Sequence, residues 1–179
     1  MVKLNLSSQI VLNKVPEEFY HPKTAVELSE LTRCEKLPTT IFPKTEEGAL
    51  SIATTIANAI RQKQQSGQYC VLGLGTGSSL TPVFNELIRL HKEEKLSFSN
   101  VVVFNAYEYF PLQPSAKNST LNQLKERLLN HIDINPQNVF TLEGTVPQER
   151  VQESCRLYEQ RIQSFGGIDI MLLGIGRIG

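Results

Sequence analysis

A glycine-rich segment with hydroxyl side chains follows a short apolar run near the middle of the chain. Residues 73–79 read GLGTGSS, directly after the run 69–72 (YCVL). Glycines let a backbone approach a ligand closely, and the free N–H groups at the start of a following helix favour an anion. We therefore expect a phosphate or another anion here, and a purely steric strand-to-helix turn is the alternative. The residues expected to hold the anion are Gly75, Thr76, Gly77, Ser78 and Ser79.

A second glycine segment, 174–179 (GIGRIG), follows the apolar run 168–173. A dinucleotide fingerprint needs a helix after it and an acid about 20 residues later, and the sequence stops at Gly179. We favour a second wall of the same site, with Gly176 and Arg177 as candidate contacts to the ligand. A nucleotide-binding oxidoreductase domain and a structural turn are the alternatives.

The third candidate is the segment 104–112 (FNAYEYFPL), in which Glu108 is the only acid. Polar groups at the carboxyl end of a parallel strand are candidates for a site, because open α/β sheets bind ligands at that edge. A surface aromatic loop with one solvated glutamate explains the segment equally well. The charged face Lys125, Glu126 and Arg127 is interpreted as solvated surface. The histidines and cysteines are scattered, so no metal site is expected.

Periodic patterns predict the elements that must position these residues. Apolar residues at helical spacing predict helices over about 24–33, 45–65, 78–92, 118–130 and 145–165. A capping box formed by Thr24 and Glu27 opens the first helix. The apolar face of the second comprises Leu50, Ile52, Ala53, Ile56, Ala57 and Ile60. Ser78 or Ser79 is expected to cap the third helix, and Asn118 the fourth.

Short apolar runs predict strands over 69–74, 101–104, 138–141 and 168–173. Strands that alternate with helices indicate a parallel sheet covered on both faces, which is a three-layer Rossmann-like α/β fold. Residues 1–44 are expected to form an arm or short helical preface, and 45–179 the α/β domain. The last strand is followed by no crossover helix, so we expect this domain to be incomplete at its C-terminus, as part of a longer protein.

Composition limits the function classes. The 179 residues include 18 basic and 18 acidic side chains, so the formal net charge is zero. That balance argues against a dedicated nucleic-acid-binding or membrane-surface domain. No apolar run approaches the ~20 residues that span a bilayer, and the first residues lack the apolar stretch of a signal peptide. A cytoplasmic location is the expectation.

Five motifs occur in one order: 71–79 (VLGLGTGSS), 101–109 (VVVFNAYEY), 130–134 (NHIDI), 158–162 (YEQRI) and 171–176 (MLLGIG). Their order and spacing resemble those of glucosamine-6-phosphate deaminases, also called isomerases. The related 6-phosphogluconolactonases share the fold, but the FNxxEY segment is closer to the deaminases. The resemblance implies conversion of glucosamine 6-phosphate to fructose 6-phosphate and ammonia, with a hexose-phosphate ligand and no organic cofactor. The oligomeric state stays open, a homo-oligomer included.

The resemblance also implies roles for individual residues. Thr76, Gly77, Ser78 and Ser79 match the loop that holds the substrate phosphate, in agreement with the anion site inferred from the residues themselves. Ser119 matches a serine that follows the catalytic segment, so it is a further candidate for binding the substrate.

Two positions depart from the family pattern. The family segment reads FNMDEY, and its Asp is the base that moves a proton between C1 and C2 of the sugar. Tyr107 occupies that position here, and a phenol, almost fully protonated at neutral pH, is a poor replacement base. The adjacent Glu108 is not a ready substitute, because neighbouring side chains of an extended segment point in opposite directions. In the final loop, which usually reads GxGxDGH, Ile178 stands at the Asp position.

Three explanations stay open. The protein binds a phosphosugar without deaminating it, as a sensing or regulatory module would. It runs another reaction, with Glu108, Arg177 or residues beyond 179 in new roles. Or the usual reaction persists weakly.

Overall fold

The computed structural model describes residues 23–33, 37–113 and 115–175, so the predictions for Gly176, Arg177 and Ile178 lie outside the described residues. The chain divides into two compact units, residues 1–48 and 49–179. In the first unit, helix α1 (Ala25–Thr32) begins with the predicted capping box, in which Thr24 and Glu27 each accept the other's backbone N–H. Helix α2 (Thr45–Gln65) begins in the first unit, and its buried residues belong to the second.

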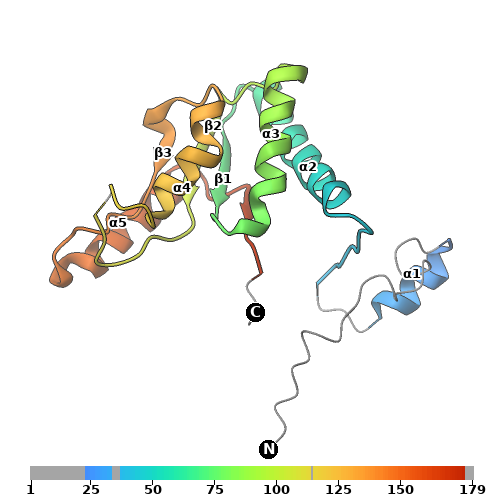
Figure 1. The fold of residues 1–179 in the computed structure, drawn as a ribbon, viewed down its shortest axis with the longest axis horizontal. Helices are drawn as coiled ribbons and strands as arrows, with labels where there is room; N and C mark the ends of the chain where they lie inside the picture. The colour runs from blue at the N-terminus through green and yellow to red at the C-terminus, as the bar shows by residue number, and fades with distance from the viewer. Residues whose placement is uncertain (1–22, 34–36, 114, 176–179) are drawn as a thin grey trace, which may run out of the picture. The chain divides into compact units, whose positions relative to one another are not determined.

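The second unit is built on a sheet of four parallel strands (Figure 1). The strands are β1 (Cys70–Leu74), β2 (Val101–Asn105), β3 (Val139–Phe140) and β4 (Ile170–Leu172). Their order is β3-β2-β1-β4, and the last residue of β1, Leu74, pairs with Asn105 of β2 and Leu172 of β4. The carboxyl ends of these three strands therefore meet, which brings the segments after them to one edge of the sheet.

Three helices cover one face of the sheet: α2, α3 (Thr81–Glu94) and α4 (Thr120–Arg127). Ile56 of α2, Phe84 of α3 and Leu124 of α4 are each at most 1% exposed and share one core with the strand residues Leu72 and Val103. Burying large apolar side chains contributes roughly 1.5–3 kcal/mol each, so this layer is the main support of the sheet.

The opposite face of the sheet carries a second, smaller core beneath α5 (Val151–Ser164). Val71, Val102 and Phe104 of the central strands pack there against Tyr158 and other partly buried residues. The Phe104 ring lies 5.0 Å from the Phe140 ring and 5.5 Å from that of Tyr158, between centroids. Helices thus flank the parallel sheet on both faces, and the predicted three-layer α/β fold is confirmed.

The helix ends differ from the predictions. Neither Ser78 nor Ser79 caps α3 with its side chain, because a 3₁₀ turn, η4 (Ser78–Leu80), precedes that helix. Ser119 rather than Asn118 caps α4. Further 3₁₀ turns are η5 (Leu129–His131), η6 (Pro136–Asn138) and η7 (Gln148–Arg150).

The buried face of α2 also needs a correction. It consists of Ala49, Ala53, Ile56, Ala57 and Ile60. Leu50 and Ile52, which we assigned to that face, are 48% and 40% exposed. Ala49, which we did not assign to that face, is 6% exposed and takes a core position instead. Over the described ranges, no helix is both long and apolar enough to cross a membrane.

Candidate functional site

The segment 75–79 follows β1 directly and runs into η4, at the carboxyl edge of the sheet. Gly75 N–H donates to the carbonyl of Leu172 at 2.9 Å, which ties the start of the segment to the end of β4. Thr76 is buried, with 3% exposure, whereas Ser78 and Ser79 are exposed. In the first turn of a helix the N–H groups have no intrahelical acceptor. The segment therefore presents backbone N–H groups and two accessible hydroxyls together.

A cavity of about 310 Å³ opens over this segment, and we name it the loop cavity. Its walls come from the ends of three neighbouring strands, as the sheet order requires. A Cβ at Gly174 would lie 2.6 Å from Ser79 Oγ, so the wall after β4 approaches the wall after β1 closely. The residues lining the loop cavity are Gly75, Thr76, Gly77, Ser78, Ser79, Tyr107, Leu173, Gly174 and Ile175.

Tyr107 forms the third wall of the loop cavity, from the segment after β2. Its hydroxyl lies 3.4 Å from Thr76 Oγ1, and either oxygen can donate the hydrogen bond. Its ring is 41% exposed and lies edge-on to Tyr109, with the centroids 6.2 Å apart. Among the described residues, the lining contains no carboxylate, imidazole or amine. Among the described lining residues of the loop cavity, Tyr107 is thus the one with an acidic or basic side chain.

Glu108 points away from the loop cavity, as the alternation of an extended segment predicts. Its carboxylate accepts hydrogen bonds from the N–H groups of Tyr109 and Thr120 at 3.0 Å, from Leu121 N–H at 3.3 Å and from Ser119 Oγ at 2.8 Å. Burial alone would raise the pKa of Glu108, but these four donors together hold it below its ordinary value. Glu108 therefore lies at the first turn of α4 as an ionised group, which the helix dipole also favours.

Ser119 belongs to the same cluster. It is buried, its hydroxyl donates to Glu108, and its Oγ accepts from Asn122 N–H at 3.4 Å as the cap of α4. The structure thus brings Glu108 and Ser119 together and leaves both out of the lining of the loop cavity. Their roles towards a substrate stay predictions, as do those of Gly176, Arg177 and Ile178.

Arg127 is a site residue that the sequence interpretation missed. We assigned it to a solvated helix face, but its Nη1 donates to the carbonyl oxygen of Thr76 at 2.7 Å. The side chain is half-buried and reaches from the last turn of α4 to the loop. One signal was available in the sequence: Arg127 lies seven positions after Thr120, on the side of the helix that Leu124 turns towards the core.

Helix α4 contacts two of the three walls of the loop cavity, the one after β2 and the one after β1. At its start, Thr120 Oγ1 donates to the carbonyl oxygen of Tyr107 at 2.5 Å, and Asn105 Nδ2 donates to Thr120 Oγ1 at 2.8 Å. At its end, Arg127 holds Thr76. A rigid helix therefore fixes the separation of the two loops.

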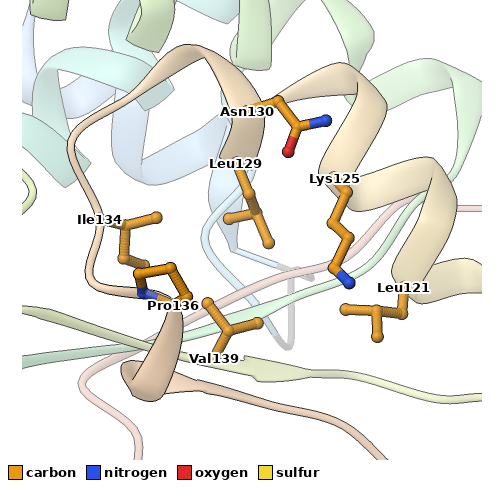
Figure 2. A pocket seen from close by; sticks show the side chains of 7 residues that line it. All are labelled: Leu121, Lys125, Leu129, Asn130, Ile134, Pro136 and Val139. Atoms are coloured by element: carbon orange, nitrogen blue, oxygen red, sulfur yellow. The ribbon is translucent and has the colours of Figure 1, made fainter.

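A second cavity, of about 320 Å³, lies beside α4 and shares no lining residue with the loop cavity (Figure 2). Most of its lining residues are apolar, and the Lys125 side chain points in towards Leu121 and Val139. The lining residues are Leu121, Lys125, Leu129, Asn130, Ile134, Pro136 and Val139. Lys125 thus lines this second cavity, whereas Arg127, two positions later, bonds to the loop at Thr76.

Residues 43–179 match the family model of glucosamine-6-phosphate isomerases/6-phosphogluconolactonase. A putative glucosamine-6-phosphate deaminase-like protein of Bacteroides thetaiotaomicron is 58% identical over 99% of this chain, which corresponds to 27% of that protein. Glucosamine-6-phosphate deaminase 2 of Giardia intestinalis is 42% identical over 76% of this chain and 49% of its own length. The chain therefore spans about half or less of these curated relatives.

Solved structures agree with the fold. A monomeric glucosamine-6-phosphate deaminase of the NagB superfamily superposes with a TM-score of 0.69 and 37% identity, over 75% of this chain and 53% of its own. A 6-phosphogluconolactonase from Trypanosoma brucei matches with a TM-score of 0.57 at 19% identity, over 80% of this chain and 54% of its own. At that identity the likeness concerns the fold alone. On its motifs, its fold and its family match, this chain belongs to the glucosamine-6-phosphate isomerase/6-phosphogluconolactonase family.

Proposed function

We propose that this chain supplies the phosphate-binding part of an enzyme that acts on a hexose phosphate, with glucosamine 6-phosphate as the substrate. The observation that carries the proposal is the loop cavity. It combines the N–H groups of a helical first turn with the hydroxyls of Ser78 and Ser79, and its described lining holds no carboxylate that would repel an anion. The relatives named as glucosamine-6-phosphate deaminases support the same substrate.

The geometry suits a phosphate at one end and a sugar at the other. A phosphate near residues 77–79 would accept hydrogen bonds from the backbone, and the positive end of the helix would favour its charge. The sugar would then lie towards Tyr107, whose ring and hydroxyl offer an apolar surface and a hydrogen-bond partner. A cavity of about 310 Å³ is at the small end of the range for small-molecule sites.

The reaction we propose is the family's: glucosamine 6-phosphate and water give fructose 6-phosphate and ammonia. Moving a proton between C1 and C2 requires a base within hydrogen-bond reach of the carbon-bound proton. A phenol occupies the position of the implied aspartate, and Glu108 is held by four donors at the start of α4. We therefore propose that this protein deaminates its substrate more slowly than relatives that carry the aspartate.

A charge placed in the loop tests the binding site. In the full-length protein, Ser79→Asp would set a carboxylate against the phosphate, and Ser79→Asn is the neutral variant of similar size. Calorimetric titration with glucosamine 6-phosphate should show at least about 30-fold weaker binding for the Asp variant, since like charges in contact cost several kcal/mol. The Asn variant also loses the hydroxyl but adds no charge, so it should bind clearly more tightly than the Asp variant. Equal affinities of the Asp and Asn variants would refute the proposed site.

A further inference from the structure

The contact between Arg127 and Thr76 joins a fixed positive charge to the backbone of the loop. The bond is short, 2.7 Å from Nη1 to the carbonyl oxygen, and its acceptor belongs to a residue that is only 3% exposed. Hydrogen bonds from a charged donor are about twice as strong as neutral ones. The guanidinium therefore restrains Thr76, the middle one of the three residues between the end of β1 and the start of η4.

The hydrogen bond to the Thr76 carbonyl also affects the N–H group of Gly77. The carbonyl of Thr76 and the N–H of Gly77 belong to the same peptide group, and Gly77 lines the loop cavity. A cation bonded to the carbonyl polarises the peptide, and hydrogen bonds in a chain strengthen one another. The Gly77 N–H thus becomes a better donor to an anion, although Arg127 itself is absent from the lining of the loop cavity.

Thr76 also connects this bond to the sugar side of the cavity. Its Oγ1 faces the Tyr107 hydroxyl at 3.4 Å, and the carbonyl of Tyr107 is held by Thr120 of the same helix. Helix α4 therefore holds the walls after β1 and β2 together. Its first residue, Thr120, bonds to Tyr107, and its last residue, Arg127, bonds to Thr76. Loss of the Arg127 contact would free one wall while the other stayed attached.

We propose that Arg127 is a positioning residue for phosphate binding: it orients the Thr76–Gly77 peptide and strengthens its N–H donor to the phosphoryl group of the ligand. This inference rests on the proposed function, since it assumes that the loop cavity holds the phosphate. It assigns to α4 a role in affinity for the phosphorylated end of the ligand, separate from any role in chemistry.

The chain offers a matched control on the same helix. Lys125 carries the same charge, but it is exposed and extends into the other cavity, as Figure 2 shows. Lys125→Met and Arg127→Met each remove one positive charge and leave an unbranched apolar side chain. A general effect of net charge would change both variants alike and would fade with added salt, whereas the proposed role concerns Arg127 alone.

The test measures the affinity of the full-length protein for glucosamine 6-phosphate, inorganic phosphate and unphosphorylated glucosamine by calorimetry. Arg127→Met should weaken binding of both phosphate-bearing ligands about tenfold, or about 1.4 kcal/mol, and change binding of glucosamine less than about twofold. Arg127→Lys, which keeps the charge, should bind phosphate ligands more tightly than Arg127→Gln. Steady-state kinetics should show a raised KM with kcat changed less, as expected for lost binding shared by the ground and transition states.

The outcomes separate the two proposals. If the unmodified protein binds glucosamine 6-phosphate but Arg127→Met and Lys125→Met bind it equally well, the positioning role is overturned and the proposed function stands. If the unmodified protein binds no phosphate-bearing ligand, both are overturned. If Arg127→Met fails to fold, the comparison of Lys with Gln at position 127 decides, and equal phosphate affinities of those two variants count against the proposal.

Discussion

Replacing Glu108 with glutamine tests how the segment after β2 is attached to α4. The carboxylate accepts four hydrogen bonds, three of them from backbone N–H groups and one from the Ser119 hydroxyl. The Gln amide keeps one acceptor oxygen and turns an NH₂ donor towards the others, so about two bonds are lost. At about 1 kcal/mol for each lost bond, with about 0.5 kcal/mol for the charge at a helix start, the loss is about 2–2.5 kcal/mol.

Chemical denaturation of the full-length protein measures this loss, and Glu126→Gln is the matched control. Glu126 is an exposed residue in the last turn of the same helix, so the same substitution there should change the free energy of unfolding by less than about 0.5 kcal/mol. Thermal unfolding gives a second measure: about 2 kcal/mol lowers the Tm of a domain of this size by about 4–8 °C.

The pH dependence follows from the lowered pKa of Glu108. Because the folded value lies below the ordinary value of 4.5, the stabilisation is fully present above about pH 4.5 and is lost as the pH falls towards the folded value. The difference between Glu108→Gln and the unmodified protein should therefore be constant near neutral pH and shrink in acid. A variant as stable as the Glu126→Gln control, or a difference that grows as the pH falls, would refute the capping role.

Three further sets of substitutions test separate parts of the structure. Lys63 Nζ lies 2.7 Å from Asp169 Oδ1. Lys63→Met and Asp169→Asn should therefore each lower the denaturation midpoint and couple in a double-mutant cycle, while additive losses would contradict the contact. Gly144→Ala would place a Cβ 2.6 Å from one backbone oxygen and 2.8 Å from another, so we expect a loss of about 1–3 kcal/mol in denaturant unfolding. Gly77→Ala, where the nearest atom is a side-chain oxygen at 3.6 Å, should be within about 0.5 kcal/mol of the unmodified protein, and equal losses would contradict the steric argument. Tyr107→Asp restores the implied base and should raise the rate of ammonia release from glucosamine 6-phosphate at least about tenfold, whereas an unchanged rate with intact binding would place the base elsewhere.

The sheet was predictable from the sequence because its central strands are apolar on both faces. Residues 70–74 and 101–105 are buried at every position, and such continuous runs differ clearly from the helical periodicity around them. Parallel strands then require that their carboxyl ends meet, so the approach of the 75–79 segment to Tyr107 follows from the topology. The edge strands were overestimated in length, because fewer neighbours pair with them.

The partners of individual polar groups could not be predicted. The pattern predicted that Glu108 points away from Tyr107, but not that it would cap a helix beginning twelve residues later at Thr120. Arg127 looked like solvated surface because its partner, a backbone carbonyl at position 76, leaves no trace in side-chain composition. Such contacts depend on the separation of two elements in space, which periodicity does not encode.

For α2, the sequence predicted the centre of the buried face but not its edges. Leu50 and Ile52 are apolar and lie on the flanks of the face that Ala53, Ile56 and Ile60 define, yet both are exposed. Hydrophobic side chains are common on protein surfaces, so their type alone does not place them inside.

The central claim is that residues 75–79 hold the phosphate of the ligand. Crystals of the full-length protein soaked with glucosamine 6-phosphate test it most directly. We expect the phosphate oxygens within about 2.7–3.2 Å of the backbone nitrogens of residues 77–79, with the sugar towards Tyr107. An ordered ligand whose phosphate lies elsewhere, or a loop cavity that stays empty at saturating ligand, would contradict the claim.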